Sequence, residues 1–307
     1  MRPTARHPRP RALFPALLGA LGVALLAAVP ASADWLAPEA GPTENAQKIN
    51  TLYWIVMAVA IPIFLGVEGA LIYAMVKFRA RKGAVPAQIR GNTRLEIGWT
   101  VGAAVISIVL AVVTFAFLPA IRNPPNSGPD GLDVRQAGLT SSPVVESGAG
   151  REPPVPPDGQ ALNIDVNGLQ YVWRYTYPDG DDNPGNNVFA YEQMVVPTNT
   201  TVVLTIRAQD VIHSWWIPAM GGKFDAVPGY TNATWFKVTE PGEWDGQCAE
   251  LCGRNHANMV ATVKAVPPAE FEAWLAGKRQ EIDAANQAAA QQREQVEAGR
   301  PPTEPGG

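Results

Sequence analysis

Two long apolar stretches stand out in the pattern of hydrophobic and polar positions. The first spans residues 52–76 with Glu68 as its single charge, and the second spans residues 97–121 without any charge. Because a helix needs about 20 apolar residues to cross a bilayer, both stretches predict membrane-spanning helices. The loop between them carries six cations and no acid before Glu96, which places this loop on the cytoplasmic side and the chain after residue 121 outside.

The first 33 residues have the pattern of a secretory signal peptide. Four arginines come first, an apolar run over residues 12–29 follows, and residues 31–33 fit the small-residue cleavage pattern. The run is short and contains Pro15, so removal is favoured over a third membrane helix. Residues 34–121 then form the mature N-terminal segment and its two membrane helices.

After the second helix the pattern changes to short runs that predict β-strands. Residues 122–160 are rich in Pro, Gly and Ser and predict a linker that is mobile unless a partner covers it. From residue 161 onward, runs rich in β-branched and aromatic residues alternate with turn signals, so residues 161–276 predict one β-sandwich or barrel. The predicted strands are residues 162–166, 171–177, 193–196, 201–206, 234–238 and 259–266.

The chain is predicted to end in a short helix and a polar tail. Residues 267–278 place Phe271, Trp274 and Leu275 on one helical face, which is the pattern of an amphipathic helix. Residues 277–307 are rich in Ala, Gln and Glu and predict a solvated tail.

Charge is distributed unevenly along the chain. Residues 1–120 contain 11 Lys and Arg against 5 Asp and Glu, whereas residues 121–307 contain 13 against 23. An acidic exterior domain argues against nucleic acid as a partner and suits a basic protein that arrives by electrostatic steering. Ordinary solubility would produce the same balance.

Very few side chains in this sequence are candidate ligands for a soft metal ion. After residue 33 the chain contains two cysteines, Cys248 and Cys252, and two histidines, His213 and His256, and Met259 follows three residues after His256. Two thiolates, two imidazoles and a thioether are soft to borderline ligands, a set that favours copper over magnesium or calcium.

Three other uses of these residues compete with this interpretation. A disulfide is common in exported proteins, but it does not need two histidines and Met259 beside it. Structural zinc sites usually place both histidines after the cysteines, whereas here the histidines flank the pair. A mononuclear blue-copper site uses one cysteine, so the second cysteine favours two metal ions.

Two bridging thiolates leave one histidine and one weak ligand for each of two copper ions. Met259 supplies one weak ligand, and the backbone carbonyl of Glu250, between the cysteines, is the natural candidate for the other. Such a centre spreads one electron over two metals and changes geometry little between redox states. It is suited to rapid electron transfer rather than to substrate chemistry.

In these residues the chain resembles the CuA domain of cytochrome c oxidase subunit II. The family pattern C-[SA]-E-x-C-G-x-x-H-x-x-M is matched in full over residues 248–259, and the resemblance extends to residues 96–100, 210–215 and 225–229. It implies a two-helix transmembrane hairpin followed by an all-β cupredoxin-like Greek-key barrel. It also implies that electrons pass from cytochrome c to haem in subunit I, which holds CuB, where oxygen is reduced and protons are pumped.

The resemblance also implies roles for individual residues. The Glu250 carboxylate would reach a magnesium ion shared with subunit I, and Glu96 would lie at the cytoplasmic mouth of a proton channel. A solvated acid favoured by the helix dipole is the alternative role of Glu96. The implied copper ligands are His213, Cys248, the Glu250 carbonyl, Cys252, His256 and Met259.

Two departures from the family concern the point at which electrons enter. The family uses the first tryptophan of a Gln-Trp-Tyr-Trp run, but here that position is Tyr171, so electrons are expected at Tyr171 or, alternatively, at Trp173. Tyr230 stands where the family usually has arginine. The predicted docking surface for a basic cytochrome c, or for a cytochrome c domain, contains four acids: Asp179, Asp181, Asp182 and Asp210.

Other functions share some of these features. A nitric oxide reductase could carry the same dinuclear copper, although Glu96 and the two-helix anchor favour an oxidase with its further subunits. A copper chaperone would need an open site, and quinol oxidase subunits lack the ligands. The chain has no Cys-x-x-Cys-His motif, so it is expected to carry no haem of its own.

Overall fold

The structure is a computed structural model that describes residues 37, 41–83, 85, 87–140, 149–179, 181 and 183–298. The predicted signal peptide, residues 1–33, lies outside the described residues, as does Asp182. So do residues 141–148 of the predicted linker and residues 299–307 of the predicted tail.

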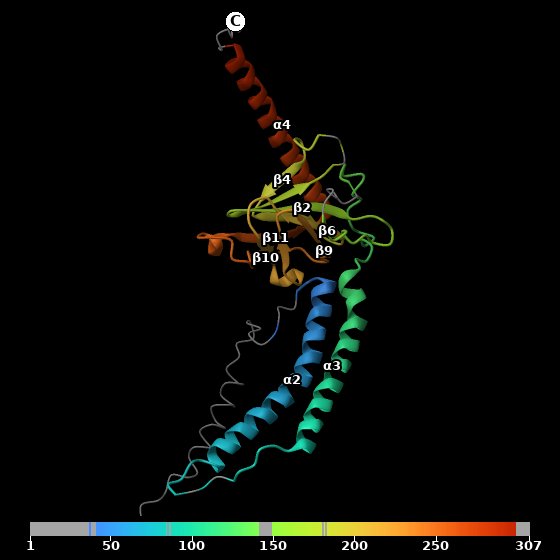
Figure 1. Cartoon of the computed structure of the whole chain (residues 1–307). Helices are drawn as coiled ribbons and strands as arrows, with labels where there is room; N and C mark the ends of the chain where they lie inside the picture. Colours follow the sequence, from blue (N-terminus) through green and yellow to red (C-terminus); the bar gives the residue numbers. More distant parts are fainter. Residues whose placement is uncertain are drawn as a thin grey trace, which may run out of the picture. The chain divides into compact units, whose positions relative to one another are not determined.

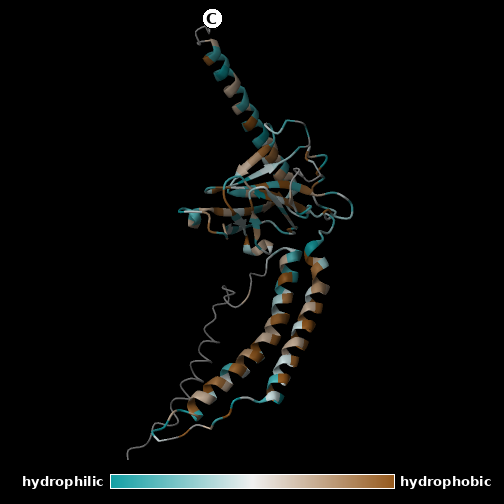
Figure 2. Cartoon of the chain, in the orientation of Figure 1, coloured by the Kyte–Doolittle hydropathy of each residue, from teal (hydrophilic) through white to brown (hydrophobic). Residues whose placement is uncertain are grey.

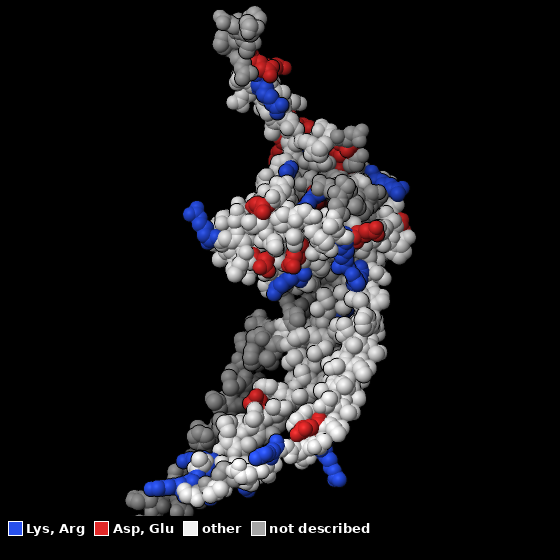
Figure 3. All heavy atoms as spheres, in the orientation of Figure 1, with Lys and Arg blue, Asp and Glu red and all other residues white. Residues whose placement is uncertain are grey.

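Helices α2 (Glu44–Lys77) and α3 (Thr93–Arg122) coincide with the two predicted membrane spans and lie side by side (Figure 1). Both are long and apolar enough to cross a membrane, and Figure 2 shows hydrophobic residues along most of their length. Lys and Arg side chains gather at the end that carries the connecting loop (Figure 3). This distribution agrees with a cytoplasmic loop.

Side chains at the helix starts satisfy backbone N–H groups that have no partner within the helix. The Thr43 hydroxyl accepts a hydrogen bond from the backbone of Ala46 in α2. At α3, Asn92 Oδ1 accepts from Leu95 N at 3.2 Å, and Glu96 Oε1 accepts from Asn92 N at 3.1 Å. Glu96 therefore has a local role in capping α3.

The described residues between α3 and residue 267 form two main β-sheets and one short ribbon. One sheet has the order β1-β9-β6-β2-β3-β4, the second has the order β10-β11-β5, and β7 pairs with β8. Parallel and antiparallel pairs are mixed, since β2 runs antiparallel to β3 but parallel to β6. The strands are β1 (Ala149–Gly150), β2 (Leu162–Leu169), β3 (Val172–Tyr177), β4 (Val188–Tyr191), β5 (Gln193–Pro197), β6 (Val202–Ala208), β7 (His213–Trp215), β8 (Phe224–Ala226), β9 (Tyr230–Phe236), β10 (Gly242–Gln247) and β11 (Val260–Val266).

One hydrophobic core joins the sheets, and it includes part of the predicted linker. In β3, Trp173, Tyr175 and Tyr177 are fully buried while the residues between them are partly exposed, as expected for a strand with one face on the core. Leu132, Val134 and Leu139 are also buried in this core. These linker residues are packed without a partner protein, contrary to the prediction of a mobile segment.

A buried junction connects the β-domain with both membrane helices. The indole Nε1 of Trp235 in β9 donates to the carbonyl of Ile121 in α3 at 3.0 Å. The Trp235 carbonyl accepts from Asn45 Nδ2 in α2 at 2.9 Å, and the same amide contacts the Met220 carbonyl at 3.2 Å. Met220 ends the short helix η1 (Pro218–Met220).

Helix α4 (Pro268–Ala298) is much longer than the predicted amphipathic helix. Its buried residues Phe271, Leu275 and Ile282 continue the predicted apolar face by two turns, and Arg279 donates to the carbonyls of Ala137 and Gly138. Most of its later residues are exposed. The predicted tail is therefore helical as far as residue 298.

Candidate metal centre

Two loops at one end of the β-domain position the candidate metal ligands. His213 opens β7, Cys248 follows β10, His256 opens the short helix η2 (His256–Asn258), and Met259 precedes β11. Backbone bonds hold the second loop closed, because Cys248 N donates to Met259 O at 2.9 Å. The neighbouring Ala249 N donates to Ser214 O at 2.9 Å, which ties this loop to β7.

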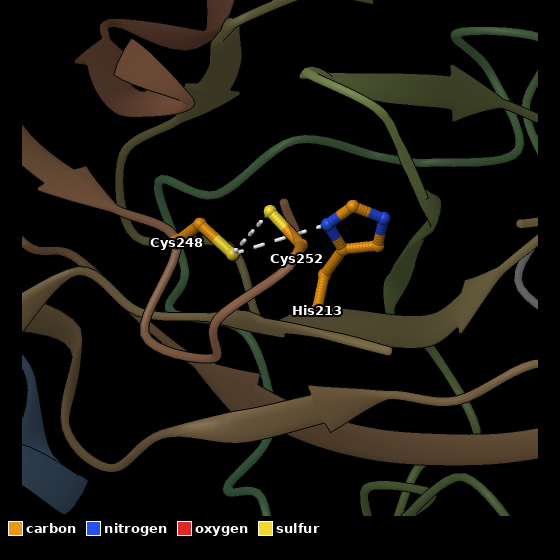
Figure 4. Close-up of side chains that lie close together, drawn as sticks. All are labelled: His213, Cys248 and Cys252. Atoms are coloured by element: carbon orange, nitrogen blue, oxygen red, sulfur yellow. Dashed lines mark hydrogen bonds between the residues drawn. The ribbon is translucent and has the colours of Figure 1, made fainter. Parts of the chain in front are cut away.

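The donor atoms form a continuous series around the two thiols. Sγ of Cys248 lies 3.9 Å from Sγ of Cys252 and 3.9 Å from Nδ1 of His213 (Figure 4). Sγ of Cys252 lies 3.6 Å from Nδ1 of His256 and 3.9 Å from Sδ of Met259. The Glu250 carbonyl oxygen lies 3.2 Å from Sγ of Cys248. All six predicted copper ligands are thus brought together.

These distances fit a soft metal ion better than a disulfide. Both cysteines are free, and their sulfurs are well beyond the ~2.05 Å of an S–S bond. Thiolate sulfur lies about 2.3 Å from a metal such as zinc, so two thiolates on one such ion lie at most about 4.6 Å apart. His213, Cys248 and Cys252 have ligand atoms that all lie within 4.8 Å of one another. The residues present therefore fit copper, the metal that this set of donors implies.

The site is buried, and its two thiols differ electrostatically. Burial alone would raise the pKa of Cys248, but His213 and the backbone of Glu250 and Ser214 lower it to about 6. Burial and the neighbouring Cys248 raise the pKa of Cys252 to about 11. Although burial opposes it, contacts with Cys248 and Asp210 raise the pKa of His213. The first thiol therefore ionises readily beside the imidazole.

Asp210 supports His213 from the side opposite to the sulfurs. Its Oδ1 lies 2.8 Å from Nε2 of His213 and 2.6 Å from the backbone N of Val211, and its Oδ2 accepts from Gln170 N at 2.6 Å. Burial would raise the pKa of Asp210, but hydrogen bonds from His213, Val211 and Gln170 lower it. A carboxylate on the second nitrogen fixes the orientation of a metal-binding imidazole. The sequence predicted Asp210 only as a docking acid, although its position three residues before His213 could have indicated this role.

Gln170 is a further residue that the sequence reasoning missed. Its side chain donates to the carbonyl of Cys252 at 2.6 Å, while its backbone N–H donates to Asp210. The turn between β2 and β3 is thereby bonded to both metal-ligand loops. No chemical signal in its residue type marks it, because the bond depends on how the strands are arranged.

The two aromatic candidates for electron arrival occupy different environments. Tyr171 is partly buried, and its hydroxyl lies close to Gly253, where an added Cβ would be 2.5 Å from it. Trp173 is 0 % exposed and lies edge-on to the His213 ring, with 5.9 Å between ring centroids. Only Tyr171 of the two is positioned to meet a partner at the surface.

The remaining predicted site residues are spread over the molecule. Glu250 has an exposed side chain beside the thiols, and Glu96 is far along the chain at the start of α3. Asp179 and Asp181 follow β3, so they lie about 20 Å along that strand from Tyr171. The structure brings Asp210 to the candidate centre but does not bring Asp179 and Asp181 there.

The fold and this site define the chain as a membrane-anchored β-protein with a buried cluster of donors that could hold a soft metal ion, consistent with a cupredoxin-like domain. The model of the family "Cytochrome C oxidase subunit II, periplasmic domain" matches residues 162–266. The model of "Cytochrome C oxidase subunit II, transmembrane domain" matches residues 36–117. The chain belongs to the cytochrome c oxidase subunit II family.

Two bacterial relatives agree with this assignment. The chain is 31% identical over 247 residues to a probable cytochrome c oxidase subunit 2 of Rickettsia bellii, covering 76% of this chain and 80% of the relative. It is 31% identical over 271 residues to cytochrome c oxidase subunit 2 of Cereibacter sphaeroides, covering 78% of each. The solved periplasmic domain of cytochrome oxidase subunit II of Bradyrhizobium japonicum is 34% identical with a TM-score of 0.36, covering 39% of this chain and 95% of that one.

Family membership confirms the predicted class of protein. The chain is a subunit of an oxidase complex, with α2 and α3 in the membrane and the β-domain in the periplasm. The family implies copper of the CuA type and partnership with other oxidase subunits.

Proposed function

We propose that this chain receives electrons from cytochrome c at a dinuclear copper centre and passes them to haem in subunit I, where oxygen is reduced and protons are pumped. The observation that carries the proposal is the series of donors from His213 through Cys248 and Cys252 to His256 and Met259. Copper held by these donors would supply one-electron redox chemistry.

The protein's own residues hold the donors in a fixed, dry arrangement. The backbone hydrogen bond from Cys248 N to Met259 O closes the loop, and Asp210 orients the His213 ring. His213 and Met259 are each 0 % exposed, so water is kept from these ligands. A rigid site of this kind needs little rearrangement when its charge changes, which favours fast electron transfer.

Electrons are proposed to arrive beside Tyr171 and to leave on the side of Glu250. Tyr171 contacts the Gly253 segment next to Cys252, and Gln170 links the same turn to the Cys252 carbonyl. The Glu250 backbone faces Cys248 while its side chain is exposed. Its carboxylate is a hard oxygen ligand, which suits a magnesium ion shared with subunit I.

Glu96 is proposed to lie at the entrance of the proton channel. It starts the second membrane helix on the predicted cytoplasmic side, where protons are taken up. Its bond to Asn92 N shows that the same carboxylate also caps α3. A role in the proton channel therefore requires that the hydrogen bond from Asn92 N to Glu96 can break and form again.

The test is the copper content and the electron paramagnetic resonance spectrum of the purified full-length chain loaded with copper. Two copper ions per chain and a seven-line type of signal are expected, because one unpaired electron is shared by two copper nuclei. The control is Cys252→Ser, which keeps His213 and Cys248 but removes the second thiolate. One copper per wild-type chain with a four-line signal would overturn the dinuclear assignment.

A further inference from the structure

Glu68 is the one charged side chain in the apolar stretch of α2. It lies nine residues before Lys77, which is about 14 Å along a helix that rises ~1.5 Å per residue. The hydrocarbon core of a bilayer is about 30 Å thick. If the Lys77 end lies at the cytoplasmic surface, the Glu68 carboxylate is well inside the membrane.

Nothing in the described part of the chain neutralises this carboxylate. Glu68 makes no hydrogen bond or ion pair among the described residues, and its side chain is exposed. On α3, the hydroxyls of Thr100 and Thr114 donate to carbonyls of their own helix. The partly buried residues of α3 are all apolar: Gly102, Ile106, Leu110, Val113, Phe117, Leu118 and Ile121.

The helical face around Glu68 is broad, apolar and left uncovered by the other described residues of this chain. Positions three, four and seven residues away share a face with Glu68, and each of these side chains is at least 42% exposed. The residues that share the Glu68 face are Ile61, Phe64, Leu65, Leu71, Ile72 and Met75.

A charged side chain on this face would be costly if the face contacted only lipid. Ionisable side chains within membrane spans are costly, and they almost always face protein or a water-filled cavity and pair with another group. An ionised carboxylate can only accept hydrogen bonds, so its complement is a donor or a cation. The apolar residues on both sides exclude a large aqueous surface and favour helix packing instead.

We propose that the Glu68 face of α2 packs against a membrane helix of another oxidase subunit that presents a hydrogen-bond donor or a cationic side chain to Glu68. The proposal goes beyond the electron-transfer function and does not depend on the copper ligands. It uses only the family's partnership with other oxidase subunits and the position of one carboxylate.

The first test measures how much of the chain copurifies with an affinity-tagged partner subunit from solubilised membranes. Glu68→Leu should lower the retained fraction about three- to tenfold, the loss expected for one interhelical hydrogen bond within a membrane. Glu68→Gln should lower it less, because the amide oxygen still accepts. Glu44→Gln is the matched control, since Glu44 is on the same helix but pairs with Lys237 at 3.2 Å outside the apolar stretch.

The second test keeps Glu68 and locates the partner by photo-cross-linking in the intact complex. A photoreactive residue at Ile72 should give an adduct with another subunit, whereas the same residue at Ile63, on the opposite face, should give none. The two positions are comparably exposed, at 55% and 46%. Wild-type retention of Glu68→Leu, no adduct at Ile72, or an equal adduct at Ile63 would each overturn the proposal.

Discussion

Asp210 Oδ1 lies 2.8 Å from Nε2 of His213, and the other nitrogen of the same ring lies 3.9 Å from Sγ of Cys248. One carboxylate therefore sets the orientation of a buried imidazole whose free nitrogen faces a thiol. The two other bonds to Asp210, from the backbone of Gln170 and Val211, hold that carboxylate in turn. The first histidine is thus positioned by a hydrogen-bond network.

Asp210→Asn is expected to weaken copper binding about 10- to 100-fold, the usual effect of removing a carboxylate partner from a ligating histidine. The asparagine cannot reproduce the charge and all three accepted bonds. The measurement is copper retention during titration with a chelator, followed by the copper spectrum. Asp179→Asn serves as the control, and equal retention by both variants would contradict the positioning role.

The variants Glu250→Gln and Met259→Leu should separate two roles of the loop, which are copper binding and magnesium binding. Glu250→Gln keeps the backbone carbonyl 3.2 Å from Cys248, so copper stoichiometry should stay nearly unchanged while the interfacial magnesium or manganese signal weakens. Met259→Leu removes the thioether near Cys252, so the copper spectrum and potential should change while the hard-metal signal persists. Loss of copper from Glu250→Gln with an intact hard-metal signal would refute this division.

Tyr171→Ala should slow electron transfer from reduced cytochrome c while leaving the copper spectrum unchanged, because Tyr171 is the partly exposed aromatic beside Gly253. Tyr171→Phe keeps the ring and should retain most of the rate in stopped-flow measurements. Trp173→Ala should behave differently and destabilise the domain by about 3–5 kcal/mol, since it removes a fully buried ring. A normal rate in Tyr171→Ala would exclude electron arrival at this position.

Docking of a basic cytochrome c should weaken at high ionic strength, since the range of exposed charges falls from about 10 Å at 0.1 M to about 3 Å at 1 M. Asp179 and Asp181 lie roughly two Debye lengths from Tyr171 along β3 at the lower ionic strength. The Asp179→Asn, Asp181→Asn double variant should therefore slow association less than about twofold at 0.1 M salt. A larger effect would place the docking surface at the far end of β3, and a salt-independent wild-type rate would remove electrostatic steering altogether.

The thiols of the metal-free chain should ionise in two separated steps, near pH 6 and near pH 11. The lowered pKa of Cys248 means that its ionisation stabilises the fold above the ordinary thiol pKa of about 8.5, and this contribution is lost as the pH falls through about 6. His213→Asn should move the first step upward, toward the ordinary value. Thiolate absorbance in the ultraviolet measures both steps, and an unshifted first step would show that His213 does not influence Cys248.

The ligand loop was predictable because five of its donors lie within twelve residues, where turns alone bring them close. His213 joined the predicted donor set because the chain after residue 33 has only two histidines, whereas no local pattern shows that it lies beside the loop, since it is 35 residues from Cys248 and its position depends on how β7 meets β10. Strand β7 has only three residues and β10 contains two glycines, so neither shows an alternating apolar pattern. Each of the six predicted strands overlaps an observed one.

The errors at both ends of the β-domain have physical causes. Leu132, Val134 and Leu139 are isolated apolar residues among turn formers, and only their tertiary packing shows that this segment belongs to the core. Helix α4 continues past its apolar face because Ala, Gln and Glu are good helix formers even when exposed. The apolar period of α4 ends at Ile282, but the helix-forming propensity of the residues continues beyond it.

The bond from Trp235 to the Ile121 carbonyl bears on any attempt to cut the β-domain away from its membrane anchor. A fragment that starts at residue 123 keeps the buried indole N–H but loses its acceptor, which costs about 1–3 kcal/mol if no water replaces it. It also lacks the Asn45 amide, which donates hydrogen bonds to the Trp235 and Met220 carbonyls in the full chain. Replacing Trp235 with a side chain that needs no acceptor would remove this cost from a soluble periplasmic fragment.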